Sequence, residues 1–169
     1  GVKAITTSCG FLTPFQKELA AAVEIPVFTS GLLLVPLVRA MLPPDKDIII
    51  FTERAHHMNE RHFNGAGWSS KDLPVKIKGM KEDAVFPTVF IGNNPELNVD
   101  VLNAEITEMS KEVIEEYPNI GAIVLECTNM GPFSSLIANT TGVPVFGINN
   151  LLELMYFSVR PKQYKEGIL

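Results

Sequence analysis

AIVLECTNMGPFSSLIANTTGVPVFG, residues 122–147, is the stretch of sequence that decides the fold, because it repeats an earlier one. Residues 4–29 read AITTSCGFLTPFQKELAAAVEIPVFT, and a shift of 118 positions aligns residues 4–34 with residues 122–152. Eleven of the 31 aligned positions are identical, and the chain's two cysteines, Cys9 and Cys127, occupy equivalent places. Such a repeat predicts two copies of one supersecondary unit.

Each copy is predicted to fold as a strand, a turn, a helix and a second strand. Each cysteine follows an apolar strand and precedes a helix that runs to about residue 23 or 139. Thr13 is predicted to cap the first helix, with Pro14 at its first position, and Gly131 with Pro132 plays that part in the second copy. The predicted strands span residues 2–7, 25–29, 120–125 and 143–147. These βαβ units imply parallel sheets, which bind ligands at the carboxyl ends of their strands.

A further α/β stretch separates the two copies. Helical spacing of apolar residues predicts a long amphipathic helix over residues 97–117, and the last predicted helix, residues 151–159, looks buried. The other predicted elements are a strand at residues 47–52, a short helix at 55–63 and a strand at 89–92. The predicted fold class is therefore α/β, with two pseudo-symmetric lobes, each a parallel sheet flanked by helices, and the active site in the cleft between them.

The position of the repeat also predicts how the lobes divide the chain. We expect residues 1–44 with residues 150–169 to form the first lobe and residues 45–149 the second. About 75 residues precede the second cysteine strand within its own half, whereas the first cysteine strand begins at residue 2. If the lobes are equivalent, the first lobe is expected to be incomplete at its N-terminus.

Composition narrows the classes of partner. The 169 residues are 46% hydrophobic, carry a net charge of −5 and contain no basic cluster, which argues against a nucleic-acid surface. The longest apolar run, residues 31–41, is too short to span a bilayer, so no membrane segment is expected. Two cysteines without a disulfide-dense pattern are typical of a reducing compartment, and we expect a cytoplasmic protein.

The two cysteines predict acid–base chemistry at one cleft. A thiol at a helix start meets the positive end of the helix dipole and unpaired N–H groups, which favour the thiolate. Two such thiols related by a pseudo-twofold axis would face each other, so that one removes a proton from a carbon next to a carboxylate while the other delivers one. A single cysteine at a strand end usually only packs, but two at equivalent repeat positions favour catalysis.

Backbone N–H groups are expected to hold the substrate carboxylate and to stabilise charge on the reacting carbon. The N–H groups concerned are those around Gly10, Phe11, Thr128 and Asn129. No glycine-rich phosphate fingerprint or P-loop is present, so no cofactor is expected. His57 and His62 lack the i, i+4 spacing of a zinc helix; no metal is expected, and the histidines are predicted to face solvent or the pocket rim, with His56 or Arg54 near the entrance.

The cysteine motifs resemble those of the aspartate/glutamate/hydantoin racemase superfamily. The resemblance rests on the segments TTSCGF at residues 6–11, IPVFTS at 25–30, VLECTN at 124–129 and GVPVF at 142–146. It implies two α/β lobes, a mechanism without pyridoxal phosphate, and a homodimer. It also adds Ser8 and Thr52 to the substrate-binding residues. The chain departs from the family at Gly10-Phe11, where glutamate racemases have Asn-Thr, and at Asn129, where a histidine is expected.

The resulting hypothesis is a cofactor-independent amino-acid racemase or epimerase in which Cys9 and Cys127 act as acid and base on opposite faces of the α-carbon. Two alternatives remain open at this point. One is a cis–trans isomerase of an unsaturated dicarboxylate such as maleate, and the other is a non-catalytic binder of carboxylated metabolites. In every case the partner is a small carboxylate or an amino acid.

Overall fold

Four parallel strands form the larger of two sheets. A computed structural model describes residues 1–92 and 94–163, and its larger sheet has the strand order β4-β3-β5-β6. The strands are β4 (Lys76–Gly79), β3 (Asp47–Thr52), β5 (Ile120–Leu125) and β6 (Val145–Phe146). The central pair, β3 and β5, are nearly continuous apolar runs, as expected of parallel strands that are covered on both faces.

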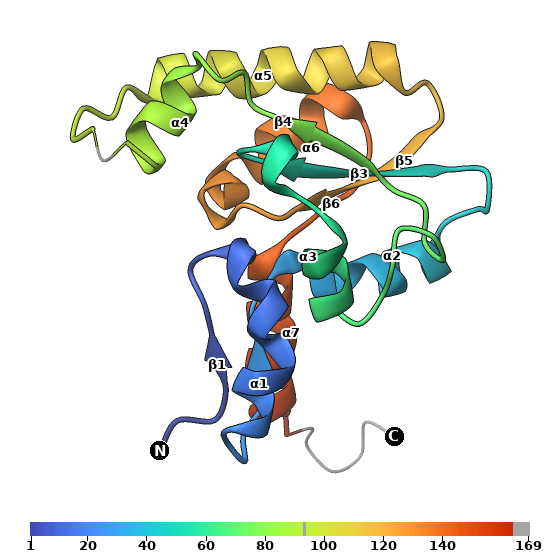
Figure 1. The fold of residues 1–169 in the computed structure, drawn as a ribbon, viewed down its shortest axis with the longest axis vertical. Coiled ribbons are helices and arrows are strands. Elements are labelled where there is room, and N and C mark those ends of the chain that lie inside the picture. The colour runs from blue at the N-terminus through green and yellow to red at the C-terminus, as the bar shows by residue number, and fades with distance from the viewer. Residues whose placement is uncertain (93, 164–169) are drawn as a thin grey trace.

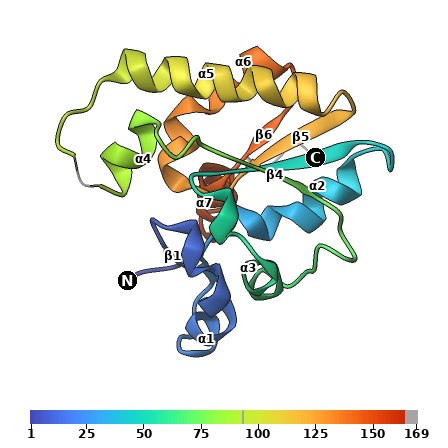
Figure 2. The ribbon, with the colours of Figure 1, turned by 45° about the horizontal axis from the view of Figure 1, so that its top comes forward.

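Side chains that alternate along β3 and β5 supply two cores, one on each face of the sheet. Ile49 and Phe51 point to one core, and Ile48 and Ile50 point to the other. The first core is covered by α5 (Val99–Glu116) and α6 (Ser134–Thr141), and the second by η2 (Gly31–Leu34), α2 (Val35–Met41) and α3 (Glu60–Gly65). Figure 1 shows α5 above the sheet and α2 beneath it. Figure 2 shows α5 and α6 together on the same side.

A small unit extends from the larger sheet at the bottom of Figure 1. It consists of β1 (Ile5–Thr6), η1 (Gly10–Phe15), α1 (Gln16–Ala21), β2 (Val27–Phe28) and α7 (Ile148–Val159). β1 and β2 pair in parallel, with Ile5 opposite Val27 and Thr6 opposite Phe28. The side chain of Gln16 ties α1 to this sheet, since its amide donates to the Val27 carbonyl and accepts from the N–H and hydroxyl of Thr29.

Residues 85–92 differ from the sequence-based expectation. Residues 89–92 were predicted to form a strand, but Val85–Phe90 is a helix, α4. Its buried Phe86 and Val89 are three residues apart and so lie on one helical face. The Glu105 carboxylate of α5 accepts the N–H groups of Val85 and Phe86 at 2.6 and 2.9 Å, which satisfies the free donors of the helix start.

The fourth strand of the larger sheet, β4, was not predicted at all. It alternates lysine with other residues, and Lys78 is held at 3.1 and 3.0 Å by Glu112 and Glu116 of α5. The strand lies at an edge and pairs only with β3, in the register Ile50 to Ile77. Short charged strands are typical of sheet edges, and they leave a weak hydrophobic pattern in the sequence.

Helix starts and ends also differ from expectation. Thr13 is not an N-cap, because η1 begins directly after Cys9 and the Thr13 hydroxyl donates to the Gly10 carbonyl inside the helix. The single helix predicted over residues 55–63 is two pieces, η3 (Ala55–His57) and α3, which restarts at the Asn59 cap. The predicted helix 151–159 is α7, but it is not buried: Leu154 and Phe157 are exposed.

The predicted lobe boundaries at residues 44/45 and 149/150 stay a prediction, and residues 164–169 of the predicted first lobe lie outside the described residues. Within residues 1–92 and 94–163, no helix combines the length and the apolar character needed to cross a bilayer.

Candidate active site

The two cysteines line one cavity of about 340 Å³, which we call the thiol cavity. Cys9 follows β1 and immediately precedes η1, and Cys127 follows β5 and immediately precedes η4 (Thr128–Phe133). Cys9 is exposed and Cys127 is buried, and neither forms a disulfide. The cavity is lined by Ser8, Cys9, Gly10, Phe11, Glu53, Arg54, Phe90, Ile91, Glu126, Cys127, Thr128 and Asn129.

Direct contacts hold the two cysteine loops together. The Thr128 hydroxyl donates a hydrogen bond to the Ser8 carbonyl, and Gly10 packs against Glu126. Of the eight residues predicted for the site, seven border this cavity: Ser8, Cys9, Gly10, Phe11, Cys127, Thr128 and Asn129. Their roles in binding and catalysis stay predictions.

Thr52 is the exception among the predicted site residues. It was expected to touch substrate, but it is fully buried and does not line the cavity. Its hydroxyl donates to Oε2 of Glu126 at 2.6 Å. The residue therefore positions a carboxylate beside the cavity, because the last residue of β3 faces the end of the neighbouring strand β5.

Two buried carboxylates border the cavity and were not predicted for the site. Glu53 follows β3 and Glu126 follows β5, and they are 7% and 1% exposed. The Cys127 thiol donates to Oε2 of Glu53 over 3.7 Å. Among the described residues, the buried side-chain oxygens without a hydrogen-bond partner are Oε1 of Glu53 and Oε1 of Glu126. The sequence did contain a signal for these two residues: each is a polar residue directly after a central strand. The carboxyl ends of parallel strands meet at one edge of the sheet, where ligands bind.

The surroundings of Cys127 favour its thiol rather than its thiolate. Burial raises the pKa of Cys127 to about 12, and the negative charges of Glu126 and Glu53 add to this effect. The N–H groups of Asn129 and Met130 act in the opposite direction and are outweighed. The expectation that the helix start lowers the pKa of this thiol is thus wrong, because desolvation and two carboxylates dominate over the N–H groups.

Burial also raises the pKa values of both carboxylates. That of Glu126 rises to about 7, mainly through desolvation, although the Thr52 hydrogen bond opposes the shift. Desolvation raises the pKa of Glu53, against the hydrogen bond from Cys127 and the positive charge of Arg54. Two carboxyl groups with raised pKa values thus lie beside one thiol, which suits acid–base chemistry on a small molecule.

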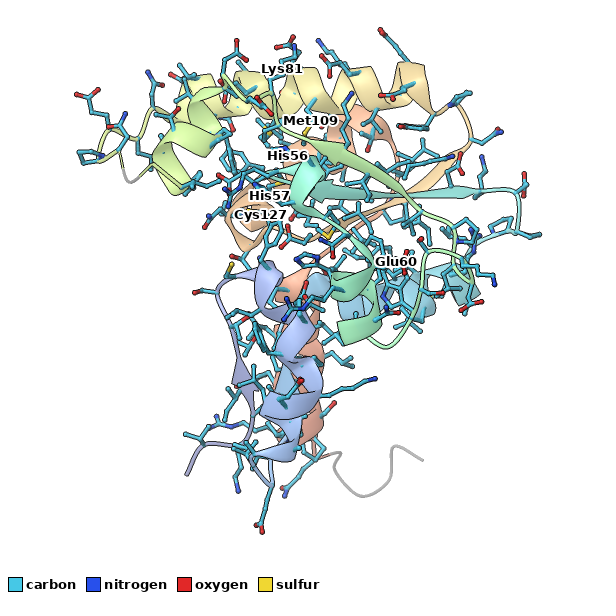
Figure 3. The ribbon with its side chains drawn as sticks, in the orientation of Figure 1. His56, His57, Glu60, Lys81, Met109 and Cys127 are labelled. Atoms are coloured by element: carbon cyan, nitrogen blue, oxygen red, sulfur yellow. The ribbon has the colours of Figure 1, made fainter. Side chains whose placement is uncertain are left out.

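The histidines lie at different depths. His62 is buried rather than solvent-facing, where its ring packs edge-on against Phe11 at 4.9 Å and its Nδ1 accepts the Asn59 N–H. His56 and His57 are exposed and border a neighbouring cavity of about 300 Å³. Figure 3 shows both of them, with Cys127, in the region between α5 and the small unit. In the part of the chain that the structure describes, no three His, Cys, Asp or Glu side chains are grouped to hold a metal ion.

Gly10→Ala is expected to disrupt the junction of the cysteine loops. A Cβ at this position would overlap the backbone and the carboxylate of Glu126, and the backbone cannot swing away as a side-chain end could. We expect the variant to lose about 1–3 kcal/mol of unfolding free energy in urea denaturation. Gly131→Ala is the matched control, because its Cβ would meet only the end of the Asn149 side chain, at 3.1 Å. Equal stabilities for the two variants would contradict the described packing.

Curated relatives of the chain are named lyases. A dimethylsulfoniopropionate lyase of Durusdinium sp. clade D is 32% identical over 151 residues, which cover 86% of this chain and 49% of that protein. Dimethylsulfoniopropionate lyase 7 of Emiliania huxleyi (strain CCMP1516) is 29% identical over 153 residues, or 86% of this chain and 44% of that protein. The chain thus spans about half the length of these relatives or less. No protein-family profile matches the sequence.

Solved structures confirm the fold class at low sequence identity. Allantoin racemase from Pseudomonas fluorescens has a TM-score of 0.52 and 18% identity over 95% of this chain and 63% of that one. A glutamate racemase from Bacillus anthracis has a TM-score of 0.50 and 18% identity over 93% and 59%. The α/β fold of parallel sheets flanked by helices, in a two-lobe arrangement, is therefore confirmed. At this identity the likeness concerns the fold alone.

The predicted identity and activity are wrong. The racemase superfamily and the racemase activity were inferred from the cysteine motifs, but the relatives at 29–32% identity are named lyases, and racemases occur only among the distant structural neighbours. The same names overturn the assignment to the isomerases, including the cis–trans isomerase, and they do not favour a non-catalytic binder. A lyase reaction has to be considered at the thiol cavity instead.

Proposed function

We propose that the chain forms the thiol-bearing part of a lyase that cleaves dimethylsulfoniopropionate. The observation that carries the proposal is the 32% identity over 86% of the chain to a protein of that name, combined with a cavity lined by both cysteines. The chain covers about half of that relative, so the proposal concerns the protein made from the complete coding sequence.

The cavity has the charges that such a substrate needs. Dimethylsulfoniopropionate carries a carboxylate at one end and a dimethylsulfonium cation at the other. The exposed Arg54 offers a cation for the carboxylate, whereas the carboxylate form of Glu126 offers negative charge for the sulfonium. Phe11 and Phe90 line the same cavity and suit the methyl groups, because aromatic faces attract sulfonium-like cations.

The reaction is an elimination. A thiolate at Cys127 removes a proton from the carbon next to the carboxylate, and the electron pair of that C–H bond forms a carbon–carbon double bond. The bond from the next carbon to sulfur breaks with its electrons going to sulfur, which leaves neutral dimethyl sulfide and acrylate. Because the pKa of Cys127 is raised to about 12, its thiol has to be deprotonated within the site before it reacts, and the thiolate that forms is a strong base.

Cys9 serves the opposite wall in this proposal. Its exposed thiol is a hydrogen-bond donor toward the substrate carboxylate, whose oxygens gain negative charge as the proton leaves. The earlier expectations of a homodimer and of a cytoplasmic location are kept as proposals, and the two unpaired cysteines support a reducing compartment.

The test is product formation by the protein expressed from its complete coding sequence. On incubation with dimethylsulfoniopropionate we expect dimethyl sulfide, measured in the headspace by gas chromatography, and acrylate, measured by liquid chromatography, in equal amounts. A preparation with both cysteines replaced by serine is the control for spontaneous elimination. A rate no higher than that of the control would exclude the proposed activity.

A further inference from the structure

The proposed elimination leaves one proton on the enzyme in every turnover. The Cys127 thiol that has received this proton must lose it before the next substrate molecule reacts. Cys127 is only 8% exposed, so direct exchange with solvent is restricted. The atom of a described side chain that accepts its hydrogen bond is Oε2 of Glu53, at 3.7 Å.

Glu53 also borders a second cavity, which we call the histidine cavity. It has a volume of about 300 Å³ and is lined by Glu53, Arg54, His56, His57, Met80, Glu82 and Pro87. The side chains of His56 and Glu82 are 56% and 87% exposed and lie 3.8 Å apart, so this cavity communicates with solvent. Glu53 and Arg54 are the residues common to both cavities. A guanidinium does not give up a proton in proteins, which leaves Glu53 as the exchanging group.

We propose that Glu53 accepts the proton of Cys127 and releases it to solvent through the histidine cavity. The inference rests on the proposed function for its place in the catalytic cycle. In the first step the S–H bond of Cys127 breaks and an O–H bond forms on Glu53, leaving a thiolate and a neutral carboxylic acid. After the thiolate has taken the substrate proton, Glu53 loses its own proton to the histidine cavity, and thiol and carboxylate are restored.

Several charged groups face Glu53 and set its protonation. Cys127 and Glu126 face it from the end of β5, and Arg54 follows it in the chain. His56 and His57 of η3 and Glu82 of the loop after β4 face it across the histidine cavity. Burial favours its neutral form, whereas the thiol hydrogen bond and the positive charge of Arg54 favour its carboxylate.

Glu126 provides an internal comparison. It is as deeply buried as Glu53 and borders the thiol cavity, but it does not line the histidine cavity, and one of its oxygens is held by Thr52. If only negative charge near the thiol mattered, replacing either Glu53 or Glu126 would have a similar effect on Cys127. A proton relay to the histidine cavity requires Glu53.

The test measures how fast Cys127 is alkylated by iodoacetamide at different pH values, with Cys9→Ser as the background and mass spectrometry as the readout. When the proton moves from Cys127 to Glu53, a thiolate and a carboxylic acid form and no proton is released to solvent. The amount of this thiolate therefore does not depend on pH above the pKa of Glu53, and the alkylation rate is expected to level off across neutral pH. In Glu53→Gln the rate is expected to rise about tenfold per pH unit without levelling off, because the proton must leave for solvent. Glu126→Gln is expected to keep the level region.

The outcomes separate the relay from the lyase activity. A level region that persists in Glu53→Gln, or one that is lost in Glu126→Gln, would overturn the relay, and neither result depends on any substrate. If the protein cleaves dimethylsulfoniopropionate, Glu53→Gln is expected to lower kcat by about 10²-fold or more with little change in KM, since the residue acts on the thiol. An unchanged kcat in that variant would also overturn the relay, whereas absence of turnover in the unsubstituted protein would refute the lyase alone.

Discussion

Cys127→Ser is expected to lower kcat/KM for dimethylsulfoniopropionate by about 10³-fold or more in the protein made from the complete coding sequence. The thiol is the base in the proposed elimination, and a serine hydroxyl ionises far less readily in the same buried position. Serine nearly preserves the volume of the side chain, so the packing beside Glu53 and Met130 is retained. The release of dimethyl sulfide over a range of substrate concentrations measures the effect.

Two controls make this result specific. Ser135→Ala changes an exposed hydroxyl on α6 and is expected to leave kcat/KM within about twofold. Thermal denaturation of Cys127→Ser checks that the variant is folded. A folded Cys127→Ser protein that keeps more than about a tenth of the activity would show that another group removes the proton.

Phe51→Ala is expected to lower the free energy of unfolding by about 3–5 kcal/mol. Phe51 is fully buried in the core beneath α5, at the centre of the larger sheet, and its removal leaves a cavity between β3 and the helices. The neighbouring side chains are held by strands and helices on both sides and can fill that space only in part. The loss of buried apolar surface and the remaining cavity therefore both lower the free energy of unfolding. Urea denaturation followed by circular dichroism measures the change.

Phe157→Ala is the matched control for Phe51→Ala. Phe157 has the same side chain but is 51% exposed on α7, and its replacement is expected to cost less than about 1 kcal/mol. Similar losses for the two variants would contradict the burial described for β3.

The sequence predicted those parts of the fold in which local pattern and tertiary packing agree. β3 and β5 were placed at residues 47–52 and 120–125 because continuous runs of isoleucine, valine and leucine are buried on both faces of a parallel sheet. The helix α5 was predicted from apolar spacing that matches one buried face. β4 and α4 were missed because their form depends on partners: ion pairs from α5 hold Lys78, and Glu105 caps Val85–Phe90.

The sequence predicted that the two cysteines lie close together, but it did not predict the charges around them. The repeat register placed both cysteines at the carboxyl ends of strands, and they do line one cavity. A helix start alone implied a lowered pKa for Cys127, but Glu53 and Glu126 come from two strand ends 73 positions apart, and their joint effect exists only in the folded protein. The sequence did not point to a lyase, because proton removal beside a carboxylate is common to racemases and to the proposed elimination, and the group on the next carbon of the substrate distinguishes the two reactions.

The pairing of β1 and β2 involves two residues from each strand, so few hydrogen bonds hold the strands of the small unit to each other. Sheets of two short strands are only marginally stable by themselves, and such regions open locally at a lower free-energy cost than the whole molecule. Cys9 is attached to this unit, whereas Cys127 is attached to the wide sheet. Local opening of the small unit is therefore expected to move Cys9 away from Cys127, and for the proposed elimination the stability of the smallest sheet would then limit the fraction of time in which both sulfur atoms border one cavity.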